Sequence, residues 1–388
     1  MYVYNRSCST IANKGIAQLL QTSRNLKYCS LLCKAFRSSF KTQIFTLNFY
    51  QLLHRFVILY SVLLVVTSSS AQLKRFSFSQ PKMGSPFNII FYADDSVKAT
   101  ALAAQSFQLI DSLNAVFSDY IPNSELSKLS ATAGKNNTLV PVSPAMMDIL
   151  LRSKEAYEKS SGAFDITIGP LIKLWRQARK ENVFPEDSII KKTLLLTGFK
   201  YLHIDTAAKT VLLTKQGMQL DLGGIAKGYT AQQVINFLKQ NGIAQALVDA
   251  GGDIATSGAP PTAKGWTVGI NVPETKEELL PGKIVLHHMA VATSGDVYQY
   301  IEHNGQKYSH ITDPRTGYGV TSQRNVTVIA KDGATADWLA TACSILPVSQ
   351  AKRLATNMHA QLLIATIQEG KTLFYFTEGF ANYLKADK

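Results

Sequence analysis

The sequence predicts an α+β protein in which antiparallel strands and helices pack as a single compact domain. Segments with alternating apolar residues and segments with helical periodicity are interspersed along the chain, without a regular strand–helix–strand period or an internal repeat. This pattern favours helices on antiparallel strands over a doubly wound parallel sheet. No long linker rich in Pro, Gly or Ser follows residue 80, which favours one compact unit.

Four segments carry the signals of helices. In the first, apolar residues recur near one helical face. In the second, Ser143 is a predicted N-cap, Pro144 occupies the first helical position and Gly162 follows the end. The predicted helices cover residues 99–120, 143–162, 224–242 and about 335–345, the last of which is expected to be the final helix of the chain.

Strands are predicted where short apolar runs lie between turn residues. Segment 210–224 is expected to form two strands around the turn Lys215-Gln216-Gly217, and segment 244–258 to form two strands around a glycine turn. A closing hairpin is expected near the C-terminus. The remaining strand segments are residues 83–95, 265–272, 283–295 and 323–331, and the hairpin pairs 360–367 with 371–380.

The charge is unevenly distributed. The chain carries a net charge of +13, which at first suggests a nucleic-acid partner. Residues 1–71, however, hold eight Lys or Arg and no Asp or Glu, leaving 32 basic against 27 acidic residues in the rest. A nucleic-acid footprint should be clustered in the folded part, so no nucleic-acid partner is expected.

A leader with a secretory signal peptide is predicted over residues 1–71, ahead of the main domain at 72–388. An apolar run over residues 56–66 follows Arg55 and is too short to span a bilayer as a helix, but it is typical of the h-region of a signal. Ser69 and Ala71 stand at the small-x-small cleavage position. The alternative is a buried hydrophobic helix.

Glycine- and acid-rich corners are the candidate sites. The segment LDLGGIAKGY (220–229) places Asp221, two glycines and Lys227 at the start of a predicted helix. A helix N-terminus with a lysine suits a phosphate, although the spacing is not that of a Walker loop. A structural strand–turn–helix junction would explain the same residues. Two other corners are GAFDITIGP (162–170) and VDAGGDIATSG (248–258), whose glycines are explained by a hairpin that needs positive φ.

The segment ATADWLATA (334–342) suggests a cation site. Asp337 and Thr341 are four residues apart on a predicted helix, so their oxygens lie on one face. A carboxylate and a hydroxyl suit a hard cation such as Mg²⁺. The alternative is an Asp at the N-cap and a Thr that bonds back to its own turn.

The segment KYSHITDPRTGYGV (307–320) gathers an imidazole, a carboxylate, a guanidinium and a hydroxyl within a few residues. Tyr308 and His310 are expected on one strand face, and Asp313-Pro314 to open a turn that holds His310 in place. An imidazole with a near-neutral pKa is a natural general base. A histidine that only braces the turn is the other interpretation.

Taken together, these segments resemble one family. MGS, NSELSKLS, GAFDITIGPLIKLW, LDLGGIAKGYTAQQV, ALVDAGGDI, ATSGD, YSHITDPRTGY and DWLATA occur in the order found in the FAD:protein FMN transferases, the ApbE family, across nearly all of residues 83–345. The resemblance implies an α+β fold of the T-fold type and a catalytic domain over residues 72–388. It also implies binding of FAD and Mg²⁺, release of AMP, and attachment of FMN through a phosphoester to a Thr or Ser of an acceptor flavoprotein.

The resemblance also implies the roles of particular residues. His310 would be the catalytic base. The partners implied are FAD and an acceptor, expected among the subunits of membrane redox complexes, with the protein exported to the periplasmic face of the inner membrane and possible peripheral membrane association. The FAD contacts would be Met83, Tyr120, Ala163, Phe164, Asp165, Asp221, Lys227 and Ile311, and the cation ligands Gly224, Asp337, Ala340 and Thr341.

Two other functions fit parts of the pattern. An FAD pyrophosphatase would use water in place of the acceptor hydroxyl and release FMN and AMP from the same site. A non-catalytic flavin-binding or carrier protein would need the pocket but neither His310 nor the Asp337–Thr341 pair, so their joint presence argues against it.

Overall fold

The structure is a computed structural model, and the chain divides into two units, residues 1–71 and 72–388, which are described separately. In the first unit only a short helical piece at 53–57 is described, so most of the predicted h-region lies outside the described residues. No helix within the described ranges is both long and apolar enough to cross a bilayer. The described residues are 53–57, 72–135, 138–270, 282–295, 299–368 and 371–385.

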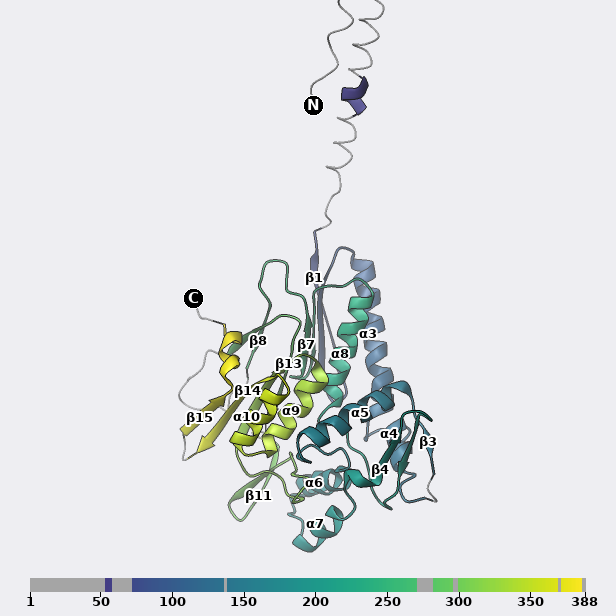
Figure 1. Cartoon of the computed structure of the whole chain (residues 1–388), viewed down its shortest axis with the longest axis vertical. Helices are drawn as coiled ribbons and strands as arrows, with labels where there is room; N and C mark the ends of the chain where they lie inside the picture. Colours follow the sequence, from purple (N-terminus) through teal and green to yellow (C-terminus); the bar gives the residue numbers. More distant parts are fainter. Residues whose placement is uncertain are drawn as a thin grey trace, which may run out of the picture. The chain divides into compact units, whose positions relative to one another are not determined.

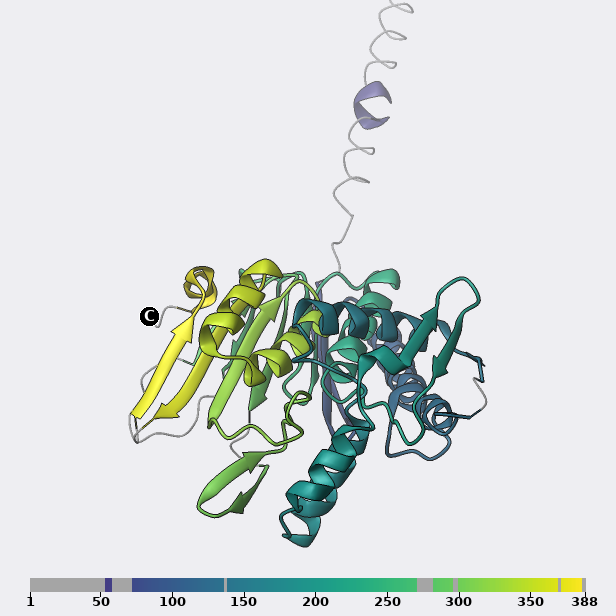
Figure 2. The same cartoon turned by 60° about the horizontal axis from the view of Figure 1, so that its bottom comes forward.

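An eight-stranded sheet forms the centre of the second unit (Figures 1 and 2). Every neighbouring pair in it is antiparallel, which confirms the predicted α+β class. In spatial order the strands are β1 (Lys74–Lys82), β2 (Ser85–Ala93), β6 (Ala246–Ala250), β7 (Ile254–Ser257), β10 (Ala290–Gly295), β13 (Arg324–Ala330), β14 (Gln361–Gln368) and β15 (Lys371–Phe376).

Four helices form a layer on one face of this sheet. Each contacts the next and lies over successive strands, so the helix order follows the strand order (Figure 1). Apolar side chains from both layers, among them Phe87, Ile89 and Phe91 of β2, are fully buried between them. The helices are α3 (Ser96–Phe117), α8 (Ala226–Gln240), α9 (Gly333–Ile345) and α10 (Val348–Asn357).

The opposite face of the sheet buries a second apolar cluster. Because side chains alternate along a strand, Leu247 of β6 points to this face while its neighbour Val248 points to the helices. Trp266 and Phe380 cover the cluster. They belong to the hairpin of β8 (Trp266–Gly269) and β9 (Lys283–Leu286) and to the short helix η2 (Glu378–Tyr383).

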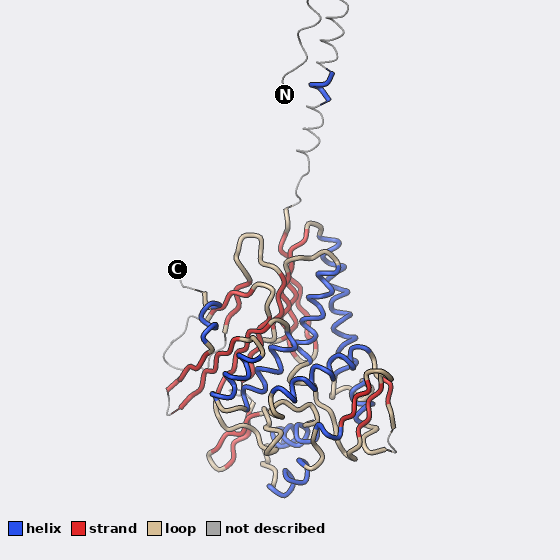
Figure 3. Tube along the Cα trace, in the orientation of Figure 1, coloured by secondary structure: helices blue, strands red, loops and turns tan. Residues whose placement is uncertain are grey.

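Smaller elements complete the unit beside the helical layer (Figure 3). A three-stranded sheet in the order β3-β5-β4 and a hairpin of β11 with β12 carry loops that reach the site described below. These elements are α4 (Glu125–Ser130), β3 (Val140–Pro141), α5 (Pro144–Lys159), α6 (Gly169–Glu181), α7 (Asp187–Leu194), η1 (Phe199–Tyr201), β4 (Leu202–Asp205), β5 (Thr210–Leu213), β11 (Tyr300–His303) and β12 (Gln306–Ser309).

Most predicted elements are confirmed, and two expectations are wrong. The N-cap of α5 is Ser143, whose hydroxyl accepts a hydrogen bond from the backbone N–H of Met146 at 3.2 Å. Segment 210–224 contains one strand, not two, because the chain after the turn makes only a single bridge, between Ile168 and Gln219. The helix at 335–345 is not the last one, since α10 follows it after a short break.

Two glycines set how closely α8 and α9 approach. A Cβ atom on Gly228 would lie 2.1 Å from the carbonyl oxygen of Gly333 and 2.7 Å from Cβ of Asp337. We expect Gly228→Ala to lower the free energy of unfolding by about 3 kcal/mol, because the helices must separate to admit the methyl group. Urea denaturation measures this. Gly269→Ala is the control, since among the described residues its Cβ would meet one atom, at 3.8 Å, and equal losses in both variants would contradict the expectation.

Candidate functional site

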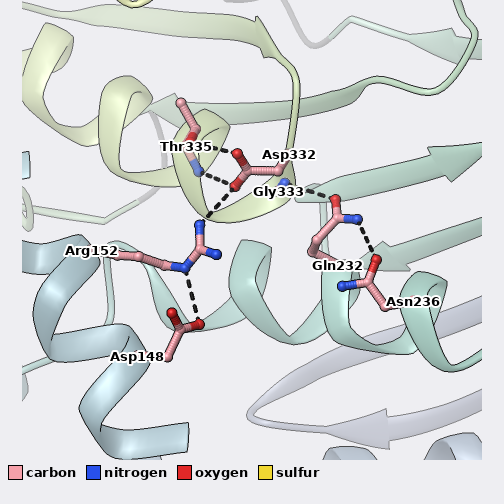
Figure 4. A network of polar contacts seen from close by, with 7 residues as sticks. All are labelled: Asp148, Arg152, Gln232, Asn236, Asp332, Gly333 and Thr335. Atoms are coloured by element: carbon pink, nitrogen blue, oxygen red, sulfur yellow. Dashed lines mark hydrogen bonds and ion pairs between the residues drawn. The ribbon is translucent and has the colours of Figure 1, made fainter.

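The start of α9 is held by side chains from two other helices (Figure 4). Asp332 caps the helix by accepting a hydrogen bond from the backbone N–H of Thr335 at 3.0 Å. Arg152 of α5 lies 3.6 Å from Asp332, and Gln232 of α8 accepts a hydrogen bond from the N–H of Gly333 at 3.2 Å. The network fixes the first turn of α9. It therefore also fixes the positions of Asp337 and Thr341 in the next two turns.

Asp337 occupies the second turn of α9 and is 6% exposed. Its Oδ2 accepts a hydrogen bond from the backbone N–H of Gly228 at 3.0 Å. Burial, with a smaller contribution from the negative charge of Asp253, raises the pKa of Asp337 well above its ordinary value. The cap of this helix is Asp332, so the N-cap interpretation of Asp337 is excluded. Capping of the helix therefore does not explain why this carboxylate is buried.

Thr341 lies one turn further, against the loop that leads into α8. A Cβ atom on Gly224 would lie 2.9 Å from Oγ1 of Thr341 and 3.1 Å from the ring of Phe164. Within the described ranges the Thr341 hydroxyl has no hydrogen-bond partner. Ser344, on the same helix, donates instead to the carbonyl oxygen of Ala340 at 2.9 Å. Thr341 therefore does not bond back to its own turn, and its oxygen is available to a ligand.

Lys227 pairs with a carboxylate from the β6–β7 turn. Its Nζ lies 2.6 Å from Oδ2 of Asp253, which is 5% exposed. Burial favours the neutral amine, but the negative charges of Asp253 and Asp337 outweigh it and raise the pKa of Lys227, so the ammonium stays charged. The turn itself uses positive φ at Gly251 (73°) and Gly252 (103°), as predicted for this hairpin.

Met83 lies in the neighbouring hairpin turn. Met83 and Gly84 have φ of 50° and 74° and join β1 to β2 in a two-residue turn. A Cβ on Gly251 would lie 2.5 Å from Cβ of Ser85, so this turn packs directly against the β6–β7 turn. Met83 and the Lys227–Asp253 pair are thus brought toward the same corner of the fold.

His310 follows β12, which ends at Ser309, so it lies just beyond the strand face where it was expected. Its backbone N–H donates to the carbonyl oxygen of Gln299 at 2.8 Å. The ring Nδ1 is buried and has no hydrogen-bond partner among the described residues. Burial and the positive charges of Arg179 and Lys227 lower the pKa of His310, so the imidazole is neutral at pH 7.

The turn after His310 has the predicted form. The N–H of Gly317 donates to the carbonyl oxygen of Asp313 at 2.8 Å, and the Asp313 carboxylate pairs with Arg315 at 2.7 Å. Ile311 is 8% exposed, and its N–H donates to the Ser309 hydroxyl at 3.0 Å. The hydrogen bonds and the ion pair of the turn are made by its own residues. The imidazole of His310 takes part in none of them among the described residues.

A second polar group surrounds Asp221. Arg176 lies 2.8 Å from Asp119 and 3.7 Å from Asp221, and its guanidinium covers the ring of Tyr120 at 4.1 Å. Tyr120 is 72% exposed. Burial and the negative charge of Asp119 raise the pKa of Asp221 to about 6, against the hydrogen bond from Gly223 and the charge of Arg176. Asp221 and Tyr120 thus both lie beside Arg176, and their contact with FAD stays a prediction.

The predicted FAD contacts at 163–165 lie next to α9 and Gly224, through the ring of Phe164. Ala163 and Phe164 are buried, and the Phe164 ring lies 6.2 Å from that of Trp338. Oδ1 of Asp165 accepts hydrogen bonds from the N–H and the hydroxyl of Thr167, at 2.8 and 2.7 Å. Burial raises the pKa of Asp165 above its ordinary value. This carboxylate shapes the turn, and its contact with FAD stays a prediction.

A cavity of about 130 Å³ adjoins the Asp221 group. Asp119 belongs to both, and Lys173 of α6 brings a positive charge to the cavity wall. None of the residues predicted from the sequence lines it. The wall is formed by Asp119, Leu126, Ser127, Ser130, Ala131, Lys173, Gln219 and Leu220.

The residues near Thr341 fit a hard cation. The buried Asp337 carboxylate and the unpartnered Thr341 hydroxyl are oxygen donors of the kind that Mg²⁺ takes, and the backbone of Gly224 lies against Thr341. No group of three or more His, Cys, Asp or Glu in the described part of the chain could hold a metal ion. A cation here would therefore depend on hydroxyl and backbone oxygens as well as Asp337. The carbonyl oxygen of Ala340 already accepts the Ser344 hydroxyl.

Four charged residues of the site were not assigned a role from the sequence. Asp119 and Asp253 lie in loops, and Arg176 and Arg179 lie on α6, a helix that was not predicted. The spacing of Trp175 and Ala178, which are buried on one face of α6, was the available signal for that helix.

The fold and the site define an α+β protein in which cationic residues of α6 and α8, carboxylates of α9 and the β6–β7 turn, and the imidazole of His310 act on one another. The chain belongs to the ApbE family, whose profile matches residues 83–364. A protein of Klebsiella pneumoniae named FAD:protein FMN transferase is 34% identical over 263 residues, covering 68% of this chain and 79% of that protein. One of Treponema pallidum with the same name is 31% identical over 291 residues, covering 71% and 80%.

Solved structures show the same fold. The flavin transferase ApbE from Vibrio cholerae superimposes with a TM-score of 0.73 at 27% identity, covering 81% of this chain and 100% of that one. The apo form of the Pseudomonas stutzeri flavinyl transferase ApbE gives a TM-score of 0.72 at 27% identity, covering 82% and 99%.

Proposed function

We propose that this protein is an FAD:protein FMN transferase, which cleaves the pyrophosphate of FAD, attaches FMN through a phosphoester to a Thr or Ser of an acceptor protein and releases AMP. The observation that carries the proposal is the convergence at one corner of the buried Asp337 carboxylate, the free Thr341 hydroxyl and the charged Lys227. The neutral His310 lies within the field of Lys227. The names of the family's characterised members agree with this reaction.

The reaction needs a base and a place for negative charge. The acceptor hydroxyl is a weak nucleophile until its proton is removed, and His310, neutral and with an unpartnered ring nitrogen, takes that proton. The hydroxyl oxygen then bonds to the phosphorus of the FMN half, and the bond from that phosphorus to the bridging oxygen breaks. The bridging oxygen leaves with AMP, and FMN remains on the acceptor.

Lys227 stabilises the phosphate charge. Its ammonium is held by Asp253, so it is positioned before the substrate arrives and loses little entropy on binding it. Mg²⁺, held by Asp337, Thr341 and the backbone oxygen of Gly224, with Ala340 as a further predicted ligand, would neutralise phosphate charge as the phosphorus is attacked.

The geometry of the site argues against a flavin carrier but does not distinguish a transferase from a pyrophosphatase. A flavin carrier has no need of a buried carboxylate with a raised pKa or of an imidazole kept free of hydrogen bonds, so the site disfavours it. An FAD pyrophosphatase would use the same site with water as the nucleophile. The protein product distinguishes the two enzymes.

The test is incubation of the mature protein with FAD, Mg²⁺ and an acceptor domain that carries a target Thr. Mass spectrometry should find the acceptor heavier by one FMN ester, and a Thr→Val acceptor should stay unmodified. Release of FMN and AMP with no adduct on any acceptor would favour the pyrophosphatase. Absence of FAD cleavage would contradict both enzymes.

We also propose that the protein acts outside the cytoplasm, on the periplasmic face of the inner membrane, with subunits of membrane redox complexes as acceptors. The basis is the Arg55-flanked apolar run at 56–66 and the small residues up to Ala71. We expect the exported form to begin near Gln72. Mass spectrometry of the N-terminus in cell fractions measures this, and an intact N-terminus retained in the cytoplasm would refute it.

A further inference from the structure

Helix α6 is docked against the segment that carries His310. The indole N–H of Trp175 donates to the carbonyl oxygen of Gly317 at 2.7 Å, and its ring stacks on Tyr308 with centroids 6.1 Å apart. Both partners belong to the segment 307–320. The helix face that continues from Trp175 is therefore presented to the site.

Two arginines follow Trp175 on α6, and their surroundings differ. Arg176 is neutralised, since it lies between Asp119 and Asp221. Arg179 is three residues on, close to Arg176 on the helix surface, and it is half-buried. Its Nη1 is buried without a hydrogen-bond partner, and no ion pair to it exists within the described residues.

The carboxylates described around these cations are already in use. Asp119 and Asp221 face Arg176, and Asp253 holds Lys227. Burial and the positive charge of Arg176 lower the pKa of Arg179 against the opposing effect of Tyr120, and no carboxylate of the described residues contributes. A buried Nη1 without an acceptor is unfavourable, and an anion bound here would supply the acceptor.

The form of the anion follows from two cations, Arg179 with its unpartnered Nη1 and Lys227, which Asp253 holds in place. The charges of Arg179 on α6 and Lys227 on α8 both act on His310, so the imidazole lies in the field of two cations from different helices. A guanidinium presents a fork of N–H groups that matches phosphate oxygens, while an ammonium contributes a point charge. A pyrophosphate, with charge on both phosphorus centres, suits such a pair.

We propose that Arg179 binds an oxygen of the substrate pyrophosphate, together with Lys227, and so holds the dinucleotide at His310. The inference rests on the proposed function in that the substrate is a dinucleotide with a pyrophosphate. It adds to the site a substrate-binding residue from α6.

The experiment compares FAD binding by calorimetry in the wild type, Arg179→Gln and Arg179→Lys. We expect the Kd of FAD to rise about 10- to 100-fold in Arg179→Gln, the usual worth of a hydrogen bond to a charged group, and less in Arg179→Lys. The salt dependence of binding should fall in Arg179→Gln, because a charge contact has been removed. Lys180→Gln, an exposed residue of the same helix, is the matched control and should leave the Kd unchanged.

The melting temperature separates binding from support of the fold. If Arg179 stabilised the fold, its replacement would lower the melting temperature. If its half-buried charge has no partner, Arg179→Gln should leave the melting temperature unchanged or raise it. An unchanged Kd for FAD, or a weaker Kd accompanied by a lower melting temperature in both Arg179 variants, would overturn the inference. A wild type that binds FAD through Arg179 but modifies no acceptor would refute the proposed function and leave the inference standing.

Discussion

Replacement of His310 by alanine is expected to slow FMN transfer by about 10²- to 10⁴-fold, the usual contribution of a positioned general base. The affinity for FAD should change little, because the imidazole is not among the predicted flavin and phosphate contacts, and all of these except the neighbouring Ile311 lie elsewhere in the chain. The loss should therefore appear in the chemical step, measured by single-turnover transfer, with the Kd of FAD measured in parallel. A variant that transfers FMN normally, or whose whole defect is weaker FAD binding or misfolding, would contradict the role and make His310 a residue that braces its turn.

The pH dependence gives an independent readout of the same residue. Burial and the charges of Arg179 and Lys227 lower the pKa of His310, so the base is protonated only at pH values below the ordinary 6.5 of histidine. The wild-type rate should rise with pH through that lowered pKa and then level, because only the neutral imidazole accepts a proton. This rise should be absent from the residual activity of His310→Ala.

Replacement of Asp337 by asparagine or alanine is expected to abolish Mg²⁺-stimulated transfer, a loss of about 10³-fold if the cation supplies several kcal/mol. Asparagine is the sharper variant, since its side-chain oxygen can still accept the hydrogen bond from Gly228 while the charge is lost. Transfer rates over a titration of Mg²⁺, with wild type in excess chelator as the reference, measure the effect. Full activity of either variant, or of wild type in chelator, would contradict it.

The stability of the same variant should change in the opposite direction. Burial raises the pKa of Asp337, so the folded state favours the protonated form, and the ionised form destabilises it as the pH rises above the ordinary pKa of 3.8. Without metal at pH 7, Asp337→Asn should melt at the same temperature as wild type or higher. Such a gain in stability with a loss of activity is typical of a residue kept for function.

The elements with strong local signals were predictable from the sequence. Ser143 and Pro144 mark the start of α5 because capping is a local interaction, and the alternation in β6 and β7 follows from burial of one strand face. Strand β1 was missed although Phe76 and Phe78 alternate with Ser77 and Ser79, which is the period of a strand with one buried face. Helix α6 was also missed, although Leu171, Trp175 and Ala178 recur on one face of it and are buried.

Only part of this group of residues was predictable from the sequence, and the contacts between its members were not. Asp337 and Thr341 could be placed on one face of a helix from their spacing alone. The partners of Lys227 and Arg176 could not, because Asp253 and Asp119 come from segments distant in sequence, brought close only by the packed helices and turns. The unpartnered Nη1 of Arg179 could be recognised only from the contacts of the described residues, because it depends on how α6 packs in the fold.

The order of strands in the large sheet has a consequence for how the chain folds. Strand β2 lies between β1 and β6, and its pairing with β6 joins residues such as Asn88 and Asp249, 161 positions apart along the chain. The β1–β2 hairpin can form early, but the apolar face that holds Phe87 and Ile89 stays uncovered until β6 and α8 have been synthesised. We therefore expect the sheet to be completed late in folding, with the apolar face of the early hairpin open to aggregation until then.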